Sequence, residues 1–410
     1  MNSEITLPAS KSISNRALIM SALSKNAGQI FNLSDSDDTR VLLAALRSAD
    51  SVIDIGAAGT AMRFLTAYFA VTEGKRILTG SERMKQRPIK ILVDALQTLG
   101  ADIQYLENEG FPPLKICGTQ LSGSEILLNG SVSSQYISAL MMIAPTMPNG
   151  LKINLEGKII SAPYIKMTAK MLGTFGVKVE ENLFSENSGF IKIAHQHYQP
   201  ADFRIEADWS AASYWYELLA IAGKGKIVLR GLYKNSLQGD SAVAHIFENL
   251  GVTTKFYNDK IEILPNGNYV KHFEYDFTEQ PDLAQTLVVT CCMCGVSFCF
   301  SGLQSLKIKE TNRVAALITE LAKLGFALCE HTEGELAWDG ARCDVAENIS
   351  IKTYSDHRMA MAFAPAALKF PLTIENPEVV SKSYTRFWED LTDVASTSLS
   401  HPETLSIQGH

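Results

Sequence analysis

The chain has 410 residues, of which 46% are hydrophobic and 20% are charged, and its formal net charge is −7. This length allows two or three domains with large apolar cores. The negative charge argues against nucleic acids and anionic membranes as partners, because both require a broad basic surface. No apolar run reaches the roughly 20 residues of a membrane-spanning helix, and residues 1–10 resemble neither a signal peptide nor a transit peptide. We therefore expect a soluble cytoplasmic protein.

The seven cysteines are an odd number, as is common in a reducing compartment. Cys291, Cys292, Cys294 and Cys299 lie in the apolar run TLVVTCCMCGVSFCF, without CxxC pairs or a nearby His. This pattern is typical of small buried hydrophobic positions rather than of a metal site, so we expect no bound metal.

The predicted elements repeat along the chain at a nearly constant interval. Six apolar helical runs begin near Ser12, Gly59, Ser133, Asp208, Asp282 and Asp356, and after the first gap of 47 residues these markers are 74 or 75 residues apart. Helices that end at Gly100, Gly176, Gly251 and Gly325 give a second series with 74 to 76 residues between members. A fixed period of this kind indicates six copies of one structural unit.

Within each copy, the pattern predicts strands and helices in the order βαβαββ. The segment DALQTLGADIQYLENEGFPPLKICG (residues 94–118) illustrates the end of a unit, with a helix, a Gly and then two short strands. The first interval has room for only one strand, so the first unit lacks about one hairpin. Six units exceed a single core, and we expect two domains of three units each.

Polar and cationic side chains gather at the predicted helix starts. The first N–H groups of a helix have no intrahelical partner and the helix dipole is positive there, so an anion is the natural ligand. PASKSISNRAL offers Lys11 and Arg16 there, with Ser12 or Ser14 as a helix cap, and GAAGTAMRFL offers Thr60 and Arg63. Each segment alone also fits a capped helix with solvated charges. Two such turns at equivalent positions of the repeat are stronger evidence for an anion site.

Other segments extend this pattern. RMKQRPIKIL places Arg87 before Pro88 at a helical first turn, and the hydroxyls of SVSSQY stand at a helix start. The segments LKIKETNR, TYSDHRMAM and VVSKSY contribute Lys309, Glu310, Arg313, Asp356, His357, Arg358 and Lys382. Several anionic groups on one small pair of substrates would fit such a collection.

The ordered motifs LPASKSISNRAL, AGTAMR, RMKQRPI, SVSSQY, SAPYI, DLAQT, KIKETNR, TYSDHRMAM and SKSY closely resemble those of the 5-enolpyruvylshikimate-3-phosphate synthase family, over nearly the whole chain. The resemblance implies an enolpyruvyl transferase of the shikimate pathway, which leads to chorismate and the aromatic amino acids. Phosphoenolpyruvate would react with the 5-hydroxyl of shikimate 3-phosphate by addition and elimination through a tetrahedral intermediate, and phosphate would leave. It also implies no metal or organic cofactor, a glyphosate target, and a protein that we expect to be a monomer.

The resemblance further implies the architecture. It predicts a two-domain, inside-out α/β barrel of six βαβαββ repeats, three per domain, with helices buried inside sheets. Residues 11–206 would form the N-terminal domain. Residues 1–10 and 207–410 would form the C-terminal domain, and the active site would lie in the cleft between the domains.

The family's site residues carry over onto three sets of positions. The set for shikimate 3-phosphate is Lys11, Ser12, Arg16, Ser133, Ser134, Gln135, Ser161, Tyr164, Asp282 and Lys309. The set for phosphoenolpyruvate is Lys11, Gly59, Thr60, Arg87, Gln135, Arg313, Arg358 and Lys382. In this second set the resemblance implies that Lys11 and Arg87 face the phosphate and that Arg313 and Arg358 face the carboxylate.

The catalytic set implied by the resemblance is Asp282, Glu310 and Lys11. The reaction needs a base for the attacking hydroxyl and an acid that protonates the methylene carbon, and two carboxyl groups can fill these roles. Taken alone, Asp282 could instead be a helix N-cap, and Glu310 could pair with Lys309 or Arg313.

The chain departs from the family pattern at Ala57 and Ser305, where many members have Asn, and in the shortened first unit. Two other functions compete with this interpretation. The enolpyruvyl transferase of cell-wall synthesis carries a reactive cysteine on a mobile loop, whereas Cys117, the only cysteine in the first half, lies in the predicted strand PLKICG. A non-catalytic phosphometabolite-binding protein would gain nothing from two additional carboxylates.

Overall fold

The computed structural model describes residues 2–24, 28–183, 188–396 and 405–407. The chain divides into two compact units. Unit 1 comprises Met1–Ala9 and Glu206–His410, and unit 2 comprises Ser10–Ile205. The first strand of the chain therefore belongs with the second half of the sequence.

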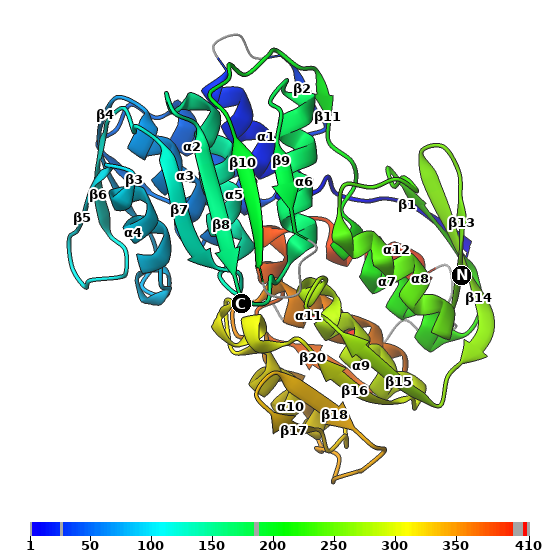
Figure 1. Ribbon diagram of the computed structural model, residues 1–410. Helices are drawn as coiled ribbons and strands as arrows, with labels where there is room; N and C mark the ends of the chain where they lie inside the picture. Colours follow the sequence, from blue (N-terminus) through cyan, green and yellow to red (C-terminus); the bar gives the residue numbers. More distant parts are fainter. Residues whose placement is uncertain (1, 25–27, 184–187, 397–404, 408–410) are drawn as a thin grey trace. The chain divides into compact units, whose positions relative to one another are not determined.

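Unit 2 alternates short strands and helices (Figure 1). Its elements are α1 (Lys11–Leu23), β2 (Ile30–Phe31), α2 (Asp37–Arg47), β3 (Val52–Asp54), α3 (Gly59–Val71), β4 (Gly74–Thr79), η1 (Met84–Gln86), α4 (Lys90–Thr98), β5 (Asp102–Tyr105), β6 (Leu114–Gly118), β7 (Ser124–Asn129), α5 (Ser134–Ile143), η2 (Ala144–Thr146), β8 (Leu151–Glu156), α6 (Ala162–Thr174), β9 (Glu180–Asn182), β10 (Ser188–Ile193) and β11 (Phe203–Arg204).

Unit 1 alternates in the same way. Its elements are β1 (Asn2–Thr6), α7 (Trp209–Ala222), β12 (Lys226–Arg230), η3 (Gly239–Ala242), α8 (Val243–Ile246), η4 (Phe247–Asn249), β13 (Leu250–Phe256), β14 (Lys260–Tyr269), β15 (His272–Asp276), η5 (Pro281–Leu283), α9 (Ala284–Cys294), β16 (Ser297–Ser301), η6 (Gln304–Ile308), α10 (Arg313–Lys323), β17 (Cys329–Thr332), β18 (Glu335–Trp338), β19 (Ile349–Ile351), α11 (His357–Phe363), η7 (Ala364–Leu368), β20 (Leu372–Ile374), η8 (Pro377–Lys382), α12 (Phe387–Ser396) and β21 (Leu405–Ile407).

Four sheets have the same topology. Their strand orders are β3-β4-β6-β5, β7-β8-β10-β9, β1-β12-β14-β13 and β15-β16-β18-β17. In each of them the first two strands are parallel and the last two form antiparallel pairs, as the registers of β7 with β8 and of β8 with β10 illustrate. Parallel neighbours require a crossover connection, and α5 and its counterparts supply it. The described residues also form a three-stranded parallel sheet, β19-β20-β21, and the two-stranded parallel sheet β11-β2.

The core of each unit is made of helices that are buried on nearly all sides. In α5 every residue from Tyr136 to Ile143 is buried, and in α11 all seven residues are buried. A helix that is apolar on every face is stable only when it is buried inside a protein. Met141, for example, has no exposed surface, and its burial contributes about 1.5–3 kcal/mol. The sheets cover these helices, as β7, β8 and β10 cover α5 in Figure 1, and the outer sheet face carries exposed side chains such as Glu125 and Leu127.

The structure confirms the expected positions of the marked helices and corrects two other local expectations. All six marked helices begin at or within two residues of their markers, and Cys291 and Cys292 are buried in α9. The predicted cap of α1 by Ser12 or Ser14 is wrong, because Ser10 occupies the N-cap position without a side-chain cap and Ser14 Oγ accepts from Ser34 N instead. Arg87 does not stand in a helical first turn either, since it directly follows η1 and α4 begins only at Lys90.

Among the residues that the structure describes, we find no helix whose length and apolarity would let it cross a membrane. This agrees with the composition, in which apolar runs stay short.

Candidate active site

Several predicted binding residues of unit 2 stand at the starts of α3, α5 and α6. Gly59 and Thr60 open α3, and Ser134 opens α5. Ser133 is the N-cap of α5, and its hydroxyl accepts from Gln135 N at 3.3 Å. Ser161 occupies the N-cap position of α6 in a left-handed conformation with φ +55° and offers no side-chain cap to that helix. Backbone N–H groups and hydroxyls are thus available at several helix starts, where an anion is favoured.

Arg16 lies inside unit 2, near the start of α1, and is only 2% exposed. Its Nε donates to Thr168 Oγ1 at 2.7 Å, its Nη1 to the carbonyl oxygen of Ser12 at 2.9 Å, and its Nη2 to Ser138 Oγ at 3.0 Å. The ring of Tyr164 lies 5.9 Å from its Cζ. Burial lowers the pKa of Arg16 to about 10, and the group stays charged at neutral pH. No carboxylate is among these partners, so the charge is hydrogen-bonded but not neutralised by them.

Arg87 is a second buried arginine, with 9% exposure. Its Nε has no hydrogen-bond partner among the described residues, and no ion pair is found for its guanidinium there either. The guanidinium lies against the start of α3, because a Cβ built on Gly59 would come within 2.5 Å of Arg87 Nη1. A desolvated guanidinium without a counter-ion is unfavourable by itself. Such a group is typical of a site for an anion.

Two polar pairs connect other predicted residues of unit 2. Gln135 Nε2 donates to Thr60 Oγ1 at 3.2 Å, which links the starts of α5 and α3. Lys11 Nζ forms an ion pair with Asp38 Oδ2 at 3.3 Å, and both side chains are largely buried. Asp38 in α2 is a partner that the sequence reasoning missed, because nothing in the spacing of the chain relates it to α1.

Arg313 is the centre of the predicted site residues in unit 1. It opens α10 and is 1% exposed. Its Nε donates to Asp356 Oδ2 at 2.7 Å, its Nη2 to Glu310 Oε2 at 3.0 Å, and its Nη1 to Asp282 Oδ1 at 3.3 Å. The buried amide of Gln285, with its oxygen toward the guanidinium, accepts from Nε at 2.9 Å. Burial works to lower the pKa of Arg313, but these three carboxylates outweigh it and raise that pKa above its usual range.

Asp282 receives three cationic side chains. Arg358 Nη2 lies 3.0 Å from its Oδ2, and Lys309 Nζ lies 3.8 Å from its Oδ1, in addition to the contact with Arg313. Burial alone would raise the pKa of the Asp282 carboxyl, but the three cations hold it well below its usual range. Burial lowers the pKa of Lys309, and the nearby Asp282, which favours the charged form of Lys309, offsets this only in part. At neutral pH, Asp282 is therefore an ionised carboxylate.

Glu310 lies between two cations as well. Its Oε2 accepts from Arg313, and its Oε1 lies 2.9 Å from Lys382 Nζ at the end of η8. The side chain of Glu310 remains 16% exposed, which leaves it accessible to a ligand.

The two structural alternatives for these carboxylates have different outcomes. Asp282 does not cap α9, because that helix has Leu283 at its N-cap position and no side-chain cap. Glu310 does form the ion pair with Arg313 that the alternative interpretation proposed. Charged groups at active sites are commonly paired, so this ion pair is compatible with a catalytic role of Glu310.

Asp240 is a buried acid beside this cluster that the sequence reasoning did not single out. Burial, together with the nearby Asp282, raises the pKa of Asp240 to about 7. Its Oδ2 accepts a short hydrogen bond from Ser210 Oγ, and Ser210 Oγ also lies 3.5 Å from Arg358 Nη2. No sequence signal marks Asp240, because a Gly-Asp pair in a polar segment is typical of a turn.

The family departures are located as follows. Ala57 is an exposed residue of the turn before α3, and Ser305 lies in η6, four residues before Lys309. Cys117, which the competing cell-wall interpretation would require on a loop, is paired within the sheet in β6.

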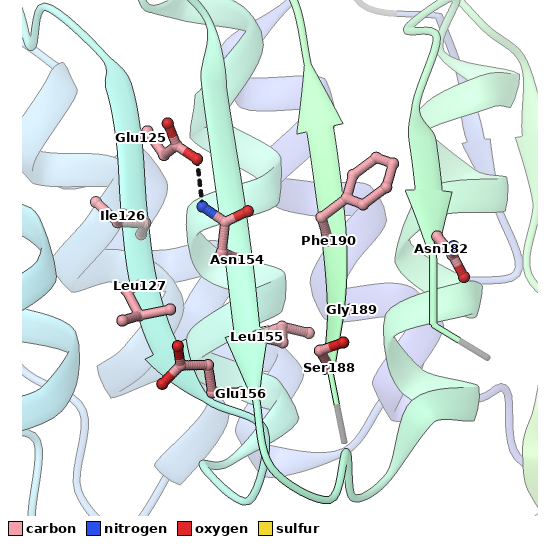
Figure 2. A pocket seen from close by; sticks show the side chains of 10 residues that line it. All are labelled: Glu125, Ile126, Leu127, Asn154, Leu155, Glu156, Asn182, Ser188, Gly189 and Phe190. Atoms are coloured by element: carbon pink, nitrogen blue, oxygen red, sulfur yellow. Dashed lines mark hydrogen bonds between the residues drawn. The ribbon is translucent and has the colours of Figure 1, made fainter. Parts of the chain in front are cut away.

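Two hollows in the surface of unit 2 contain none of the predicted site residues. The larger, about 650 Å³, lies on the outer face of the sheet β7-β8-β10-β9 (Figure 2). Its lining residues are Glu125, Ile126, Leu127, Asn154, Leu155, Glu156, Asn182, Ser188, Gly189 and Phe190. The smaller, about 370 Å³, is lined by Val71, Glu73, Gly118, Thr119, Gln120, Leu121 and Thr146. The helix starts that carry predicted binding residues are therefore a better candidate for the active site than either hollow.

Comparisons with known proteins show the family of this chain. The family model described as EPSP synthase (3-phosphoshikimate 1-carboxyvinyltransferase) matches residues 1–50 and 48–391. This chain belongs to the EPSP synthase family. A 3-phosphoshikimate 1-carboxyvinyltransferase of Bacteroides fragilis is 54% identical over 388 residues, which are 94% of each chain. The enzyme of the same name from Photobacterium profundum is 38% identical and covers 96% of this chain and 97% of its own.

The fold agrees with that membership. A solved structure of EPSP synthase from Acinetobacter baumannii matches with a TM-score of 0.74 and 20% identity, over 96% of this chain and 95% of that one. At this identity the likeness supports the mixed α/β fold alone. Membership in the EPSP synthase family also sets aside the cell-wall transferase as the identity of this chain.

Proposed function

We propose that this chain is a 3-phosphoshikimate 1-carboxyvinyltransferase. It transfers the enolpyruvyl group of phosphoenolpyruvate to the 5-hydroxyl of shikimate 3-phosphate and releases phosphate. This is a step of the shikimate pathway, which supplies aromatic amino acids. The family membership of nearly the whole chain supports the reaction, and the charges of the described residues support the substrates.

The observation that carries the proposal is the state of Arg16 and Arg87, two of the buried arginines of unit 2. Arg16 has only neutral hydrogen-bond partners, and the Nε of Arg87 has none, within the ranges that the structure describes. A protein tolerates a desolvated cation when a bound anion compensates it for part of its working cycle. Shikimate 3-phosphate and phosphoenolpyruvate each carry a phosphate and a carboxylate, so both are suited to such groups.

We assign the substrates to the residues as the resemblance implies. Lys11 and Arg87 bind the phosphate of phosphoenolpyruvate, next to Gly59, Thr60 and Gln135. Its carboxylate binds the cations of unit 1, which are Arg313, Arg358 and Lys382. Shikimate 3-phosphate binds the hydroxyl-bearing helix starts and Arg16, with Asp282 and Lys309 from unit 1. The full set for this acceptor is Lys11, Ser12, Arg16, Ser133, Ser134, Gln135, Ser161, Tyr164, Asp282 and Lys309.

The carboxyl groups have complementary tasks in this proposal. Asp282 accepts the proton of the attacking 5-hydroxyl. Glu310 delivers a proton to the methylene carbon of the donor, and Lys11 stabilises the charge that develops on the phosphate. The proton movements then reverse as phosphate leaves the tetrahedral intermediate. None of these steps needs a metal or an organic cofactor.

The finer architecture is part of the same proposal. Six βαβαββ repeats, three per domain, account for the four sheets of identical strand order, and a shortened first repeat accounts for the two-stranded sheet β11-β2. We take residues 11–206 as one domain and residues 1–10 with 207–410 as the other. A monomer and a cytoplasmic location complete the proposal, and light scattering tests the monomer.

A phosphate-release assay tests the function. The purified chain is incubated with phosphoenolpyruvate, with and without shikimate 3-phosphate, and inorganic phosphate is measured together with the enolpyruvyl ether product. We expect release only when both substrates are present, in equal amounts with the ether. Phosphate release without the acceptor, or release that a uridine-diphospho-sugar supports as well as shikimate 3-phosphate does, would contradict the proposal.

A further inference from the structure

The partners of Arg16 form a small hydroxyl network whose proton positions can be assigned. Thr168 Oγ1 lies 2.8 Å from the carbonyl oxygen of Tyr164, to which it donates its single proton. It therefore accepts from Arg16 Nε at 2.7 Å and from Ser138 Oγ at 2.9 Å. Ser138 has then used its proton, so its oxygen accepts from Arg16 Nη2 at 3.0 Å. Every proton of the two hydroxyls has one consistent position.

The network is fully buried and comes from three helices. Ser138 in α5 and Thr168 in α6 have no exposed surface, and Arg16 in α1 has nearly none. The ring of Phe64 in α3, 5.4 Å from the Arg16 Cζ, covers the guanidinium further. A side chain that is packed and hydrogen-bonded on this many sides has little freedom to reorient. The arrangement therefore fixes the direction of the guanidinium before a ligand arrives.

The choice of hydroxyls has an electrostatic consequence. A carboxylate at either position would hold Arg16 as firmly, but it would also cancel the charge, as Asp356 and its neighbours do for Arg313 in unit 1. Hydroxyls hold the group through neutral oxygens and leave the whole charge for another partner. Arg16 has five N–H groups, and the three hydrogen bonds use one on each nitrogen. One N–H on each terminal nitrogen thus has no partner among the described residues, and two N–H groups match the two oxygens of a carboxylate.

We propose that Thr168 and Ser138 are positioning residues that hold Arg16 in place without neutralising it and thereby set the affinity for an anionic group of the acceptor substrate. This inference rests on the proposed function, because it takes shikimate 3-phosphate as the ligand of Arg16. Neither hydroxyl touches the substrate in this proposal. They act through the guanidinium alone.

The test is calorimetric binding of shikimate 3-phosphate to Thr168→Val, which keeps the shape and removes the hydroxyl. The variant leaves the Arg16 Nε buried without an acceptor and deprives Ser138 of its acceptor. Loss of such a charge-assisted hydrogen bond should weaken acceptor binding about 10- to 100-fold. Steady-state kinetics should show the same rise in the Michaelis constant for the acceptor and a much smaller change for phosphoenolpyruvate. Thr168→Ser restores the hydroxyl and should restore binding.

Thr66→Val provides a matched control. Thr66 lies in α3 of the same unit, is equally buried, and donates to the carbonyl oxygen four residues earlier at 2.7 Å, as Thr168 does at 2.8 Å. Its hydroxyl has no contact with Arg16 within the hydrogen bonds of the described chain. We expect this variant to bind the acceptor as the unmodified chain does. Ser138→Ala, which removes one acceptor and no bulk, tests the same inference if Thr168→Val does not fold.

The outcomes separate the two levels of inference. An unmodified chain that does not bind shikimate 3-phosphate contradicts the proposed function itself. If the unmodified chain binds it, equal binding by Thr168→Val and Ser138→Ala overturns the positioning role. Equal losses in Thr168→Val and Thr66→Val, or equal effects on both substrates, overturn it as well, because they indicate a general packing defect.

Discussion

Replacement of Gly59 by alanine should separate donor binding from folding. An alanine Cβ at this position would lie 2.5 Å from Arg87 Nη1 and 3.0 Å from its Cζ and Nη2. Contacts between such atoms are optimal near 3.5 Å, so the guanidinium has to retreat by roughly 1 Å. The contact is with the end of a flexible side chain, and the helix itself need not move. A displacement of this size in a substrate-binding group costs up to about 10²-fold in activity.

The stability of the Gly59→Ala variant should stay the same or rise, although its activity falls. Gly59 opens α3 without a positive φ, so alanine fits the backbone there. Alanine restricts the unfolded chain more than glycine does, and such a replacement stabilises a helix by about 0.4–1 kcal/mol. We therefore expect a Michaelis constant for phosphoenolpyruvate that is about 10- to 100-fold higher, an acceptor constant within a few-fold, and an unchanged or higher denaturation midpoint.

Gly173→Ala is the control for this prediction. Gly173 lies within α6 of the same unit, and a Cβ there would meet nothing within 4 Å. The control should gain stability without a change in either Michaelis constant. Steady-state kinetics with each substrate varied in turn, together with urea denaturation of both variants, measures all these quantities. An unchanged donor constant in Gly59→Ala, or equal changes for both substrates, would show that Arg87 does not bind the donor.

Three further substitutions test the charged residues around Arg313 in unit 1. Glu310→Gln should lower turnover by about 10² to 10⁴, the usual contribution of a general acid or base, with folding intact by circular dichroism; near-normal turnover would rule out the acid role. Asp356→Ala removes a fully buried partner of Arg313 and should lower the unfolding free energy by about 3–5 kcal/mol in urea titrations, and an unchanged midpoint would refute this. Asp240 has a folded-state pKa of about 7 against an ordinary value of 3.8, so between these two pH values the folded chain binds this proton more tightly than the unfolded chain does. The contribution of Asp240 to stability therefore falls as the pH rises from about 4 to about 7. Asp240→Asn should therefore gain stability relative to the unmodified chain between about pH 4 and pH 7 in denaturation series, and parallel pH profiles would contradict the assignment.

The sequence predicted the helix starts well because the signals for them are local. A Gly, Ser or Asp before an apolar run identifies the start of α3, α5, α7 or α11 without any knowledge of the tertiary fold. The cap of α1 was predicted wrongly because the helix already begins at Lys11, which places Ser12 and Ser14 inside its first turn. The hydroxyl of Ser14 accepts instead from Ser34 N, a partner 20 residues away that the local sequence does not reveal.

The partners of the site residues were beyond the reach of the sequence for the same reason. The motifs identified Lys11, Arg16 and Arg313 as cations, but not which groups would face them. Asp38, Thr168 and Gln285 come from other helices, and the repeat period gives only the position of each helix along the chain. Whether a buried arginine is neutralised depends on these partners, so the electrostatic character of the site could be read only from the fold.

The arginines of the predicted site have different partners in the two units, and this difference affects how the donor binds. In unit 1, Arg313 and Lys382 are already paired with Glu310, whereas Arg16 and Arg87 of unit 2 have no carboxylate partner among the described residues. A donor carboxylate that binds Arg313 or Lys382 has to compete with Glu310, so one carboxylate replaces another and little net attraction is gained. The exchange instead releases Glu310 from its cations, which favours its protonated form when the proton is needed. Glu310→Gln removes the competitor, so we expect it to bind phosphoenolpyruvate more tightly while it turns over more slowly. Weaker donor binding in this variant, measured by calorimetry, would show that Glu310 and the donor do not compete for the same cations.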